Sequence, residues 1–508
     1  MIQLIATISL LVFIFLMLGI GVSSSRKVTG VNEFLLGGRN IGPLLSAFAY
    51  GTSYFSAVIF IGYAGMHGWN IGLGCIWIGV GNAVIGCLIA WLLLAKKTRR
   101  MTHRLEARTI PEFLSSRYSC KQMKIYAAAV IFIFLVPYAA SVYKGLGTMF
   151  SAIYGGADPL ICMLLVAILT GIYLVLGGYI ATALNDFIQG VIMIAGILCM
   201  IVILVNRPEV GGFSQIVPRL AAVNTQLVDV TGGSSTSFLI TNIMLTSFGV
   251  WGLPQMVHKY YAIKDEAGIR TATVISTVFA MIIGCGAYFT GSLSRLFLPA
   301  TPEGMPDVPG GYDSVMPSLL MQALMHSPLA MVVLSIIMLL LLSASMSTLA
   351  AIVLSSSSAV SVDLVGELHP TIKDKSQMWL MRLLCVLFVA LSYLFAAMNV
   401  SFIVNLMSFS WGVVAGSFIG PFLWGLYWKG TTKAGAWAGL LCGIVVVGGL
   451  LTYNCATIGF AAAKSFAPQF GVSAMVASVI VVPVVSMFTR KYKTEQVEWM
   501  FTSEESEA

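Results

Sequence analysis

Long apolar segments recur along this 508-residue chain and set the strongest limit on its fold. A helix needs about 20 apolar residues to cross the hydrocarbon core of a bilayer, which is about 30 Å thick. We therefore predict an all-α polytopic membrane protein with about 13 transmembrane helices. The predicted spans are 3–23, 43–66, 70–95, 124–150, 158–178, 183–205, 237–257, 270–298, 328–360, 380–398, 401–428, 434–455 and 471–489.

The composition leaves no room for a large soluble domain. Hydrophobic residues make up 58% of the chain and charged residues 9%, whereas soluble domains carry about 25% charged residues. The nine cysteines lie mostly in apolar runs, and no CxxC, HExxH or P-loop motif is present. No paired carboxylates or nucleophile–base set stands out either, so we expect residues 1–508 to form one transmembrane domain and not an enzyme.

Positive charge indicates the orientation. If the N-terminus lies outside, all but five of the 28 Lys and Arg fall on the cytoplasmic side; the exceptions are Lys144, Arg207, Arg219, Arg295 and Lys464. The positive-inside rule then predicts a multi-pass protein of the bacterial cytoplasmic membrane with a cytoplasmic C-terminus. The net charge of +8 thus reflects topology and attraction to the lipid bilayer, and we expect no nucleic-acid partner.

The second span is unusually polar in its first half, where Ser46, Gly51, Thr52, Ser53 and Ser56 lie. Glycine weakens a helix, and hydroxyls compete for its backbone hydrogen bonds. Such a helix can break in the membrane and expose carbonyls to an ion or solute, as secondary transporters do. The alternative is a close helix crossing, which small residues also favour.

A second interrupted segment lies at the corresponding place in the second half of the chain, where Gly249, Gly252 and Pro254 interrupt an apolar run. Paired interrupted helices point to a transport site. Because each group has five spans, the second group enters the membrane from the opposite side. The predicted organisation is an extra helix at 3–23, inverted repeats at 43–205 and 237–428, two helices within 434–489, and a cytoplasmic tail at 490–508.

Hydroxyl groups are dense in the apolar segment 339–364. The hydroxyls of Ser347 and Thr348, with the carbonyl of Ala344, offer oxygens to a hard cation such as sodium. Carbonyls of the broken second span, near Thr52 and Phe55, could complete the shell. The alternative is that these hydroxyls bond back to their own helix, which is the better interpretation of the run 355–358.

Two charged residues interrupt apolar segments. Asp186 lies in GGYIATALNDFIQG, where a carboxylate is expected to be functional in coupling or gating; a helix cap is the equally weighted alternative. Lys144 lies in the predicted span 124–150, after Pro137 and Tyr138. Its side chain can extend to the interface, or it can act in gating as a counter-charge for a carboxylate solute.

Together these motifs resemble the sodium:solute symporter family, which includes bacterial proline and pantothenate symporters. The resemblance is carried by NEFLLGGRNIGPLLSAFAYGTSYFSA, TIPEFLSSRY, GGYIATALNDFIQG, GLPQ, SMST and GPFLWGLYWKGTTKAGAWAG. It implies a five-plus-five inverted repeat of the leucine-transporter type. It also implies one sodium ion bound by the carbonyls of Thr52, Phe55 and Ala344 and the hydroxyls of Ser347 and Thr348.

The resemblance also bears on stoichiometry and solute. Some relatives hold a second sodium with the residue matching Asp186 and hydroxyls one turn beyond SMST; here that turn reads Ala350–Ala351, so we expect one Na⁺ per solute. Proline symporters have other residues at the positions of Tyr54, Thr246 and Val250, which counts against proline. Pantothenate symporters lack a counterpart of Tyr138. We expect a small carboxylate-bearing solute: pantothenate, an amino acid or a monocarboxylate. Its expected contacts are Ser53, Tyr54, Tyr138, Ser141, Trp251, Gln255, Ser408 and Trp411, although the aromatic residues could equally be core packing.

Two other functions remain open on the sequence. A proton-coupled carrier of the same fold would use Asp186 as a relay and would transport without sodium. A non-transporting sensor would bind solute without flux. We expect the protein to function as a monomer.

Overall fold

The computed structural model describes residues 2–26, 28, 30–324, 330–489 and 494–501. These residues are almost entirely helical and form no β-strand beyond two isolated bridges. The α-helices of four or more residues are α1 (Ile2–Ser25), α2 (Val31–Leu36), α3 (Pro43–Tyr54), α4 (Ala64–Ile71), α5 (Ile76–Gly81), α6 (Lys96–Arg104), α7 (Ile110–Tyr118), α8 (Lys121–Ile153), α9 (Pro159–Val205), α10 (Ile216–Val223), α11 (Thr236–Gly249), α12 (Pro254–Ala262), α13 (Ala267–Ala280), α14 (Gly286–Ser292), α15 (Val315–Leu324), α16 (Ala330–Ser358), α18 (Asp374–Ala397), α19 (Ile403–Tyr427), α20 (Lys433–Ile458), α21 (Phe460–Ala463), α22 (Ala467–Met487) and α23 (Thr494–Phe501).

Eleven helical segments of the described chain are long and apolar enough to span a membrane, so the expected number of about 13 is not confirmed. The number is lower because two long helical segments each cover parts of two predicted spans, and each of these segments contains a glycine with positive φ. Gly72 (φ 69°) interrupts the continuous segment from Val58 to Arg104, and Gly178 (φ 54°) interrupts α9. A straight helix of 47 residues would measure about 70 Å, more than twice the hydrocarbon thickness, so α9 is not a single span.

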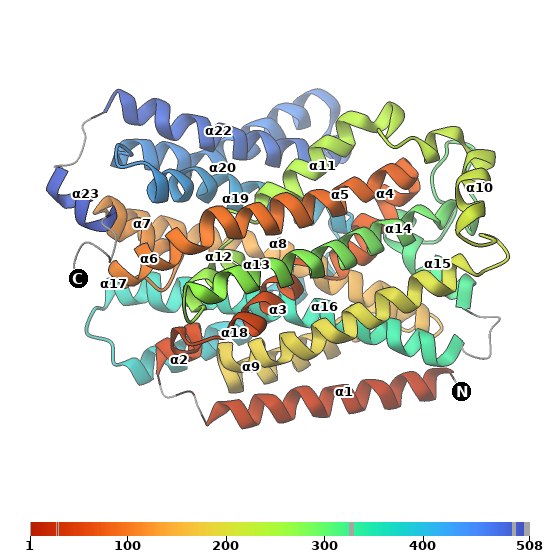
Figure 1. The fold of residues 1–508 in the computed structure, drawn as a ribbon, viewed down its shortest axis with the longest axis horizontal. Helices are drawn as coiled ribbons and strands as arrows, with labels where there is room; N and C mark the ends of the chain where they lie inside the picture. Colours follow the sequence, from red (N-terminus) through yellow and green to blue (C-terminus); the bar gives the residue numbers. More distant parts are fainter. Residues whose placement is uncertain (1, 27, 29, 325–329, 490–493, 502–508) are drawn as a thin grey trace.

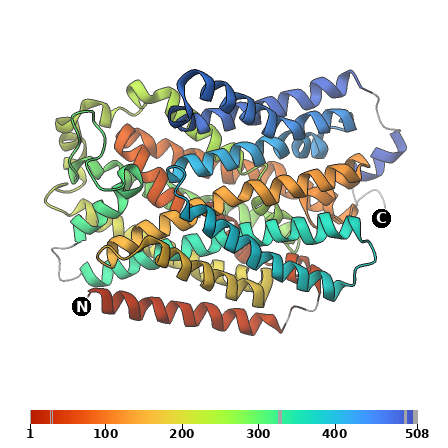
Figure 2. The same ribbon diagram turned by 180° about the vertical axis from the view of Figure 1, so that it is seen from behind.

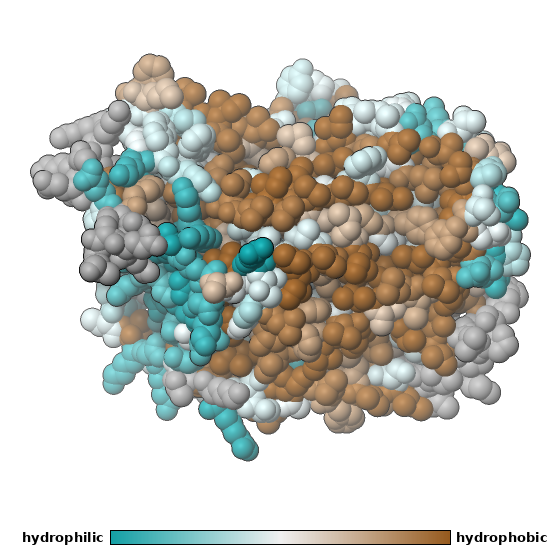
Figure 3. Space-filling model, in the orientation of Figure 1, coloured by the Kyte–Doolittle hydropathy of each residue, from teal (hydrophilic) through white to brown (hydrophobic). Residues whose placement is uncertain are grey.

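The long helices run roughly side by side along the longest axis of the molecule (Figures 1 and 2). Helix α1 begins at one end of the bundle, and α23 lies at the other. The visible face is largely hydrophobic along the helices, and hydrophilic residues gather at the end where α2 and α6 lie (Figure 3). Helices α16 and α19 are buried along nearly all of their apolar length, whereas α1 faces outward.

Both predicted helix interruptions are confirmed. Helix α3 ends at Tyr54, and helical structure resumes with a π-helical turn, η2 (Val58–Tyr63), that leads into α4. In the second half, α11 ends at Gly249 and α12 begins at Pro254. Phe55 has extended backbone (φ −104°, ψ 112°), which removes it from both flanking helices.

The cytoplasmic tail was predicted as residues 490–508, and its described part is the short helix α23. The carbonyl of Trp499 accepts a hydrogen bond from Arg104 of α6 (2.7 Å), and the Phe501 ring lies 5.3 Å from the Arg117 guanidinium. Arg117 belongs to α7, the helix formed by TIPEFLSSRY. The end of the acidic tail sequence lies outside the described residues.

Candidate functional site

The break in α3 lies against the hydroxyl-rich part of α16. Because the last carbonyls of a helix have no partner within it, those of Thr52 and Ser53 are free to meet another element. The Thr348 hydroxyl lies 3.3 Å from the Thr52 carbonyl oxygen, 3.2 Å from that of Ser53 and 3.0 Å from that of Ala344. The Ser347 hydroxyl donates to the Thr52 hydroxyl at 2.8 Å. All five residues are buried.

Four of the five predicted sodium ligands are therefore in mutual contact: Thr52, Ala344, Ser347 and Thr348. The fifth, Phe55, is the residue at which α3 ends, and its amide donates to the Gly51 carbonyl at 3.3 Å. Uncharged oxygens gathered in this way suit a hard cation.

Ser345, which was not among the predicted site residues, links α16 to the segment that follows the break in α3. Its hydroxyl accepts a hydrogen bond from the amide of Ala57 at 3.1 Å. That amide belongs to the first turn of the resuming helix, where donors lack partners within the helix. By contrast, Ser357 and Ser358 bond back to carbonyls of their own helix, as expected for that serine run.

Three of the predicted solute residues form an aromatic cluster. The Tyr54 and Trp411 rings stack with centroids 6.4 Å apart, and the Tyr138 ring meets Trp411 edge-on at 5.6 Å. The Tyr54 hydroxyl donates to the carbonyl of Thr246 on α11 (2.7 Å). The cluster therefore joins α3, α8 and α19 and touches the interrupted α11.

The other predicted solute residues are less closely grouped. Ser141 donates to the Tyr138 carbonyl at 2.6 Å, and Ser408 shares a 3.0 Å hydrogen bond with Tyr63. Trp251 lies in the break between α11 and α12, and its indole donates to the Ile85 carbonyl at 3.1 Å. The Ser53 hydroxyl and the Gln255 side-chain carbonyl are buried without a hydrogen-bond partner among the described residues.

Asp186 is buried in the interior of α9, so its interpretation as a helix cap is wrong. Its carboxylate lies 4.0 Å from the ammonium group of Lys259 on α12, and both side chains are 2% exposed. Helix α9, which carries Asp186, packs against both α16 and α3. A buried charge pair thus adjoins the oxygen cluster. Lys259 follows the predicted seventh span, 237–257, so the sequence alone indicated a cytoplasmic loop position for it.

Lys144 is paired within the protein. Its ammonium lies 2.7 Å from the Asp313 carboxylate, which precedes α15, and donates to the Ser401 carbonyl at 2.8 Å. The second Asp313 oxygen accepts from the amide of Ile403, the first residue of α19 (3.1 Å). Burial raises the pKa of Asp313 above its ordinary value, although Lys144 opposes this effect. The pair links α8, the loop before α15, and α19.

Comparisons with known proteins agree with this arrangement. A family model described as the sodium:solute symporter family matches residues 34–443. An osmoregulated proline transporter of Bacillus subtilis is 28% identical over 444 residues, which cover 87% of each chain. A sodium/proline symporter of Staphylococcus aureus is 29% identical over 449 residues, 87% of this chain and 84% of that protein. A substrate-bound, outward-open Na⁺-coupled sialic acid symporter superposes with a TM-score of 0.78 at 16% identity, covering 96% of this chain and 99% of that one.

Two interrupted helices around a buried cluster of polar and aromatic groups define a polytopic membrane carrier of the leucine-transporter type, which confirms the predicted fold class. The chain belongs to the sodium:solute symporter family, a family of solute carriers and not of enzymes.

Proposed function

We propose that this protein imports a small organic solute together with sodium, one Na⁺ per solute, by alternating access. The observation that carries the proposal is the approach of Thr348 to the carbonyls at the break in α3. Sodium among the oxygens of Thr52, Phe55, Ala344, Ser347 and Thr348 would join two helices that belong to different repeats.

Coupling then follows from which helices the ion joins. Sodium and solute each favour one conformation by the difference in their binding free energies for the two conformations. When both are bound, the carrier closes on its outer side and opens on its cytoplasmic side. The low sodium concentration of the cytoplasm then favours release. The membrane potential adds about 2.3 kcal/mol per charge per 100 mV, so an electrogenic cycle can concentrate the solute.

The Lys259–Asp186 pair supports a stoichiometry of one sodium per solute. A lone buried carboxylate beside Ser347 would favour a second cation. Here the Lys259 ammonium already supplies a positive charge 4.0 Å away. One turn beyond the SMST motif, Ala350 and Ala351 offer no hydroxyl oxygen.

For the solute, we propose a carboxylate-bearing molecule held near Tyr54, Tyr138 and Trp411. Aromatic rings provide apolar contact area and, from tyrosine, a hydrogen-bonding hydroxyl. The names of the relatives make an amino acid the first solute class to test, with pantothenate and monocarboxylates next. Lys144 is not assigned as the solute's counter-charge because it is paired with Asp313.

For orientation, we propose that the α6 end faces the cytoplasm. Lys96, Lys97, Arg99, Arg100 and Arg104 lie on this short helix. A concentration of positive charge marks the cytoplasmic side of membrane proteins. The start of α1 would then lie outside, since it is at the opposite end of the bundle (Figure 1).

The test is thermal stabilisation of the purified full chain by a panel of amino acids, pantothenate, monocarboxylates and sugars, each in sodium and in potassium. We expect one carboxylate class to raise the unfolding midpoint only when sodium is present. Uptake into proteoliposomes by the Ser347→Ala/Thr348→Ala variant should then need more sodium for half-maximal rate. Unchanged sodium dependence in that variant would remove the proposed sodium site.

The same experiments separate the alternatives. A proton-coupled carrier that uses Asp186 as a relay would show solute stabilisation and flux indifferent to sodium. A sensor would show stabilisation without flux into liposomes.

A further inference from the structure

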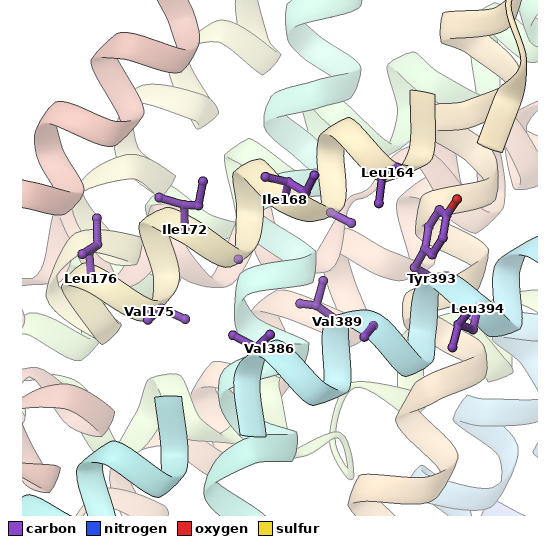
Figure 4. Close-up of a pocket in the computed structure, with 12 residues that line it drawn as sticks. Leu164, Ile168, Ile172, Val175, Leu176, Val386, Val389, Tyr393 and Leu394 are labelled. Atoms are coloured by element: carbon purple, nitrogen blue, oxygen red, sulfur yellow. The ribbon is translucent and has the colours of Figure 1, made fainter. Parts of the chain in front are cut away.

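A hydrophobic groove of about 590 Å³ lies between the first part of α9 and α18 (Figure 4). Leu164, Tyr393 and Leu394 lie toward one end, and Leu176 and Val386 toward the other. Apart from Tyr393, the residues that line it are aliphatic or glycine. The groove belongs to neither the oxygen cluster nor the aromatic cluster.

The groove faces the hydrocarbon of the membrane. Large exposed apolar side chains flank it on both helices, including Leu165 and Ile168 on α9 and Leu383 and Leu387 on α18. From Leu164 to Leu176 the helix rises about 18 Å at 1.5 Å per residue, a little more than half of the roughly 30 Å hydrocarbon core. The groove therefore matches the acyl region of one leaflet.

The two ends of the groove differ. At the Leu164 end, the Tyr393 hydroxyl donates to the Leu160 carbonyl at 3.3 Å and ties the two helices together. At the other end, Arg382 lies four residues before Val386 and so on the same helix face. This end of the groove lies toward the start of α18. The first residue of α18, Asp374, accepts a hydrogen bond from the Val31 amide of α2 (3.2 Å).

Arg382 has no acidic partner in the part of the chain that the structure describes. Its guanidinium lies 5.6 Å from the Phe34 ring and 5.5 Å from the Trp379 ring. Its Nε is buried without a hydrogen-bond acceptor among the described residues. Trp379 is 61% exposed, as is typical of tryptophans at the membrane interface. An unneutralised guanidinium thus lies near headgroup depth at the open end of a hydrocarbon groove.

We propose that the groove and Arg382 form a binding site for an anionic phospholipid, with its phosphate at Arg382 and one acyl chain along the groove. A guanidinium presents paired donors that match phosphate oxygens. A second copy of this chain packed symmetrically on the groove would bring another Arg382 to this face and no anion. Charge complementarity therefore favours lipid over a dimer contact.

The test measures thermal unfolding of the purified full chain with added dioleoyl phosphatidylglycerol or dioleoyl phosphatidylcholine, and counts retained lipids by native mass spectrometry. We expect phosphatidylglycerol to raise the unfolding midpoint more than phosphatidylcholine. Arg382→Gln should abolish that difference. Gly171→Leu should reduce retention of both lipids, because a Cβ at Gly171 meets no atom within 4 Å and the longer side chain would fill the groove.

Two matched variants serve as controls. Arg270→Gln removes an exposed arginine from the start of α13, and Gly448→Leu fills similarly open space on α20; both should behave as the unchanged protein. Equal effects of the two lipids, or an undiminished phosphatidylglycerol effect in Arg382→Gln, would overturn the proposal. Loss of a dimer in Gly171→Leu with unchanged lipid retention would also overturn it, in favour of a contact between copies.

Discussion

The side chain of Thr348 meets the main chain of Thr52 where the first interrupted helix ends, with the hydroxyl 3.3 Å from the carbonyl oxygen. The contact joins α16, in the predicted second repeat (237–428), to α3, in the predicted first repeat (43–205). Any movement of α16 relative to α3 would therefore change the distance between the Thr348 hydroxyl and the Thr52 carbonyl oxygen.

We therefore expect Thr348→Val, which removes the hydroxyl at nearly constant size, to raise the sodium concentration for half-maximal uptake about tenfold or more. One lost ion contact of about 1.4 kcal/mol produces a change of that size. Thr348→Ser retains the oxygen and should stay close to the unchanged protein. The measurement is initial uptake into proteoliposomes against external sodium. Similar behaviour of the two variants would show that the hydroxyl is not a ligand.

The Asp186–Lys259 pair provides a second prediction. Lys259→Met leaves the Asp186 carboxylate buried without its cation, which costs about 3–5 kcal/mol when a buried pair is broken. We expect this variant to be destabilised in potassium and stabilised by sodium more steeply than the unchanged protein.

Asp186→Asn combined with Lys259→Met should lose that additional sodium effect, while Lys264→Met, a change at an exposed lysine near α12, should have none. Thermal unfolding across a sodium series measures all four proteins. An unaltered sodium response in Lys259→Met would contradict the role of Lys259 as an internal cation.

A third prediction concerns the ion pair between Lys144 and Asp313. Either Lys144→Met or Asp313→Asn leaves one partner alone in a largely buried position, and each should lower the free energy of unfolding by about 3 kcal/mol. The double variant should cost less than the sum of the single changes. Lys464→Met is the control, because Lys464 lines a pocket together with Lys144 and Asp313 but its ammonium donates to the Val400 carbonyl. Strict additivity of the two changes would show that the pair is not coupled.

A fourth prediction concerns pH. Burial opposes ionisation of the Glu112 carboxylate, but Arg108 and Lys124 outweigh it and lower the pKa of Glu112. The ionised group therefore contributes stability above its unfolded pKa of about 4.3, and this contribution is lost as pH falls through the lower folded pKa. We expect Glu112→Gln to be about 1–3 kcal/mol less stable near neutral pH and to lose less stability on acidification.

Thermal unfolding from about pH 7 to about pH 3 checks this prediction, with the exposed Glu106, which lies between α6 and α7, changed to Gln as the control. A parallel pH profile for Glu112→Gln and the unchanged protein would rule out this role of Glu112.

The sequence predicted the helical class and both helix breaks because hydropathy, glycine and proline act locally. The expected number of about 13 spans is not confirmed, because the segment from Val58 to Arg104 and helix α9 each continue as helix through a bend, at Gly72 and at Gly178, near a predicted boundary between two spans. Among site residues, hydroxyl-bearing Ser347 and Thr348 stood out in an apolar helix. The partners of Asp186 and Lys144 did not, because Lys259 and Asp313 come from segments that only tertiary packing brings alongside them.

The hydrogen bond from the Ala57 amide to Ser345 means that α16 supplies the cap of the helical segment that resumes after the break in α3. A cap of this kind contributes about 1 kcal/mol. Separation of α16 from the broken helix would therefore fray the first turn of the resuming segment as well as disperse the oxygen cluster. Loss of the ion-binding geometry and local helix melting would then be a single cooperative event, in which the ion's departure changes the length of a helix.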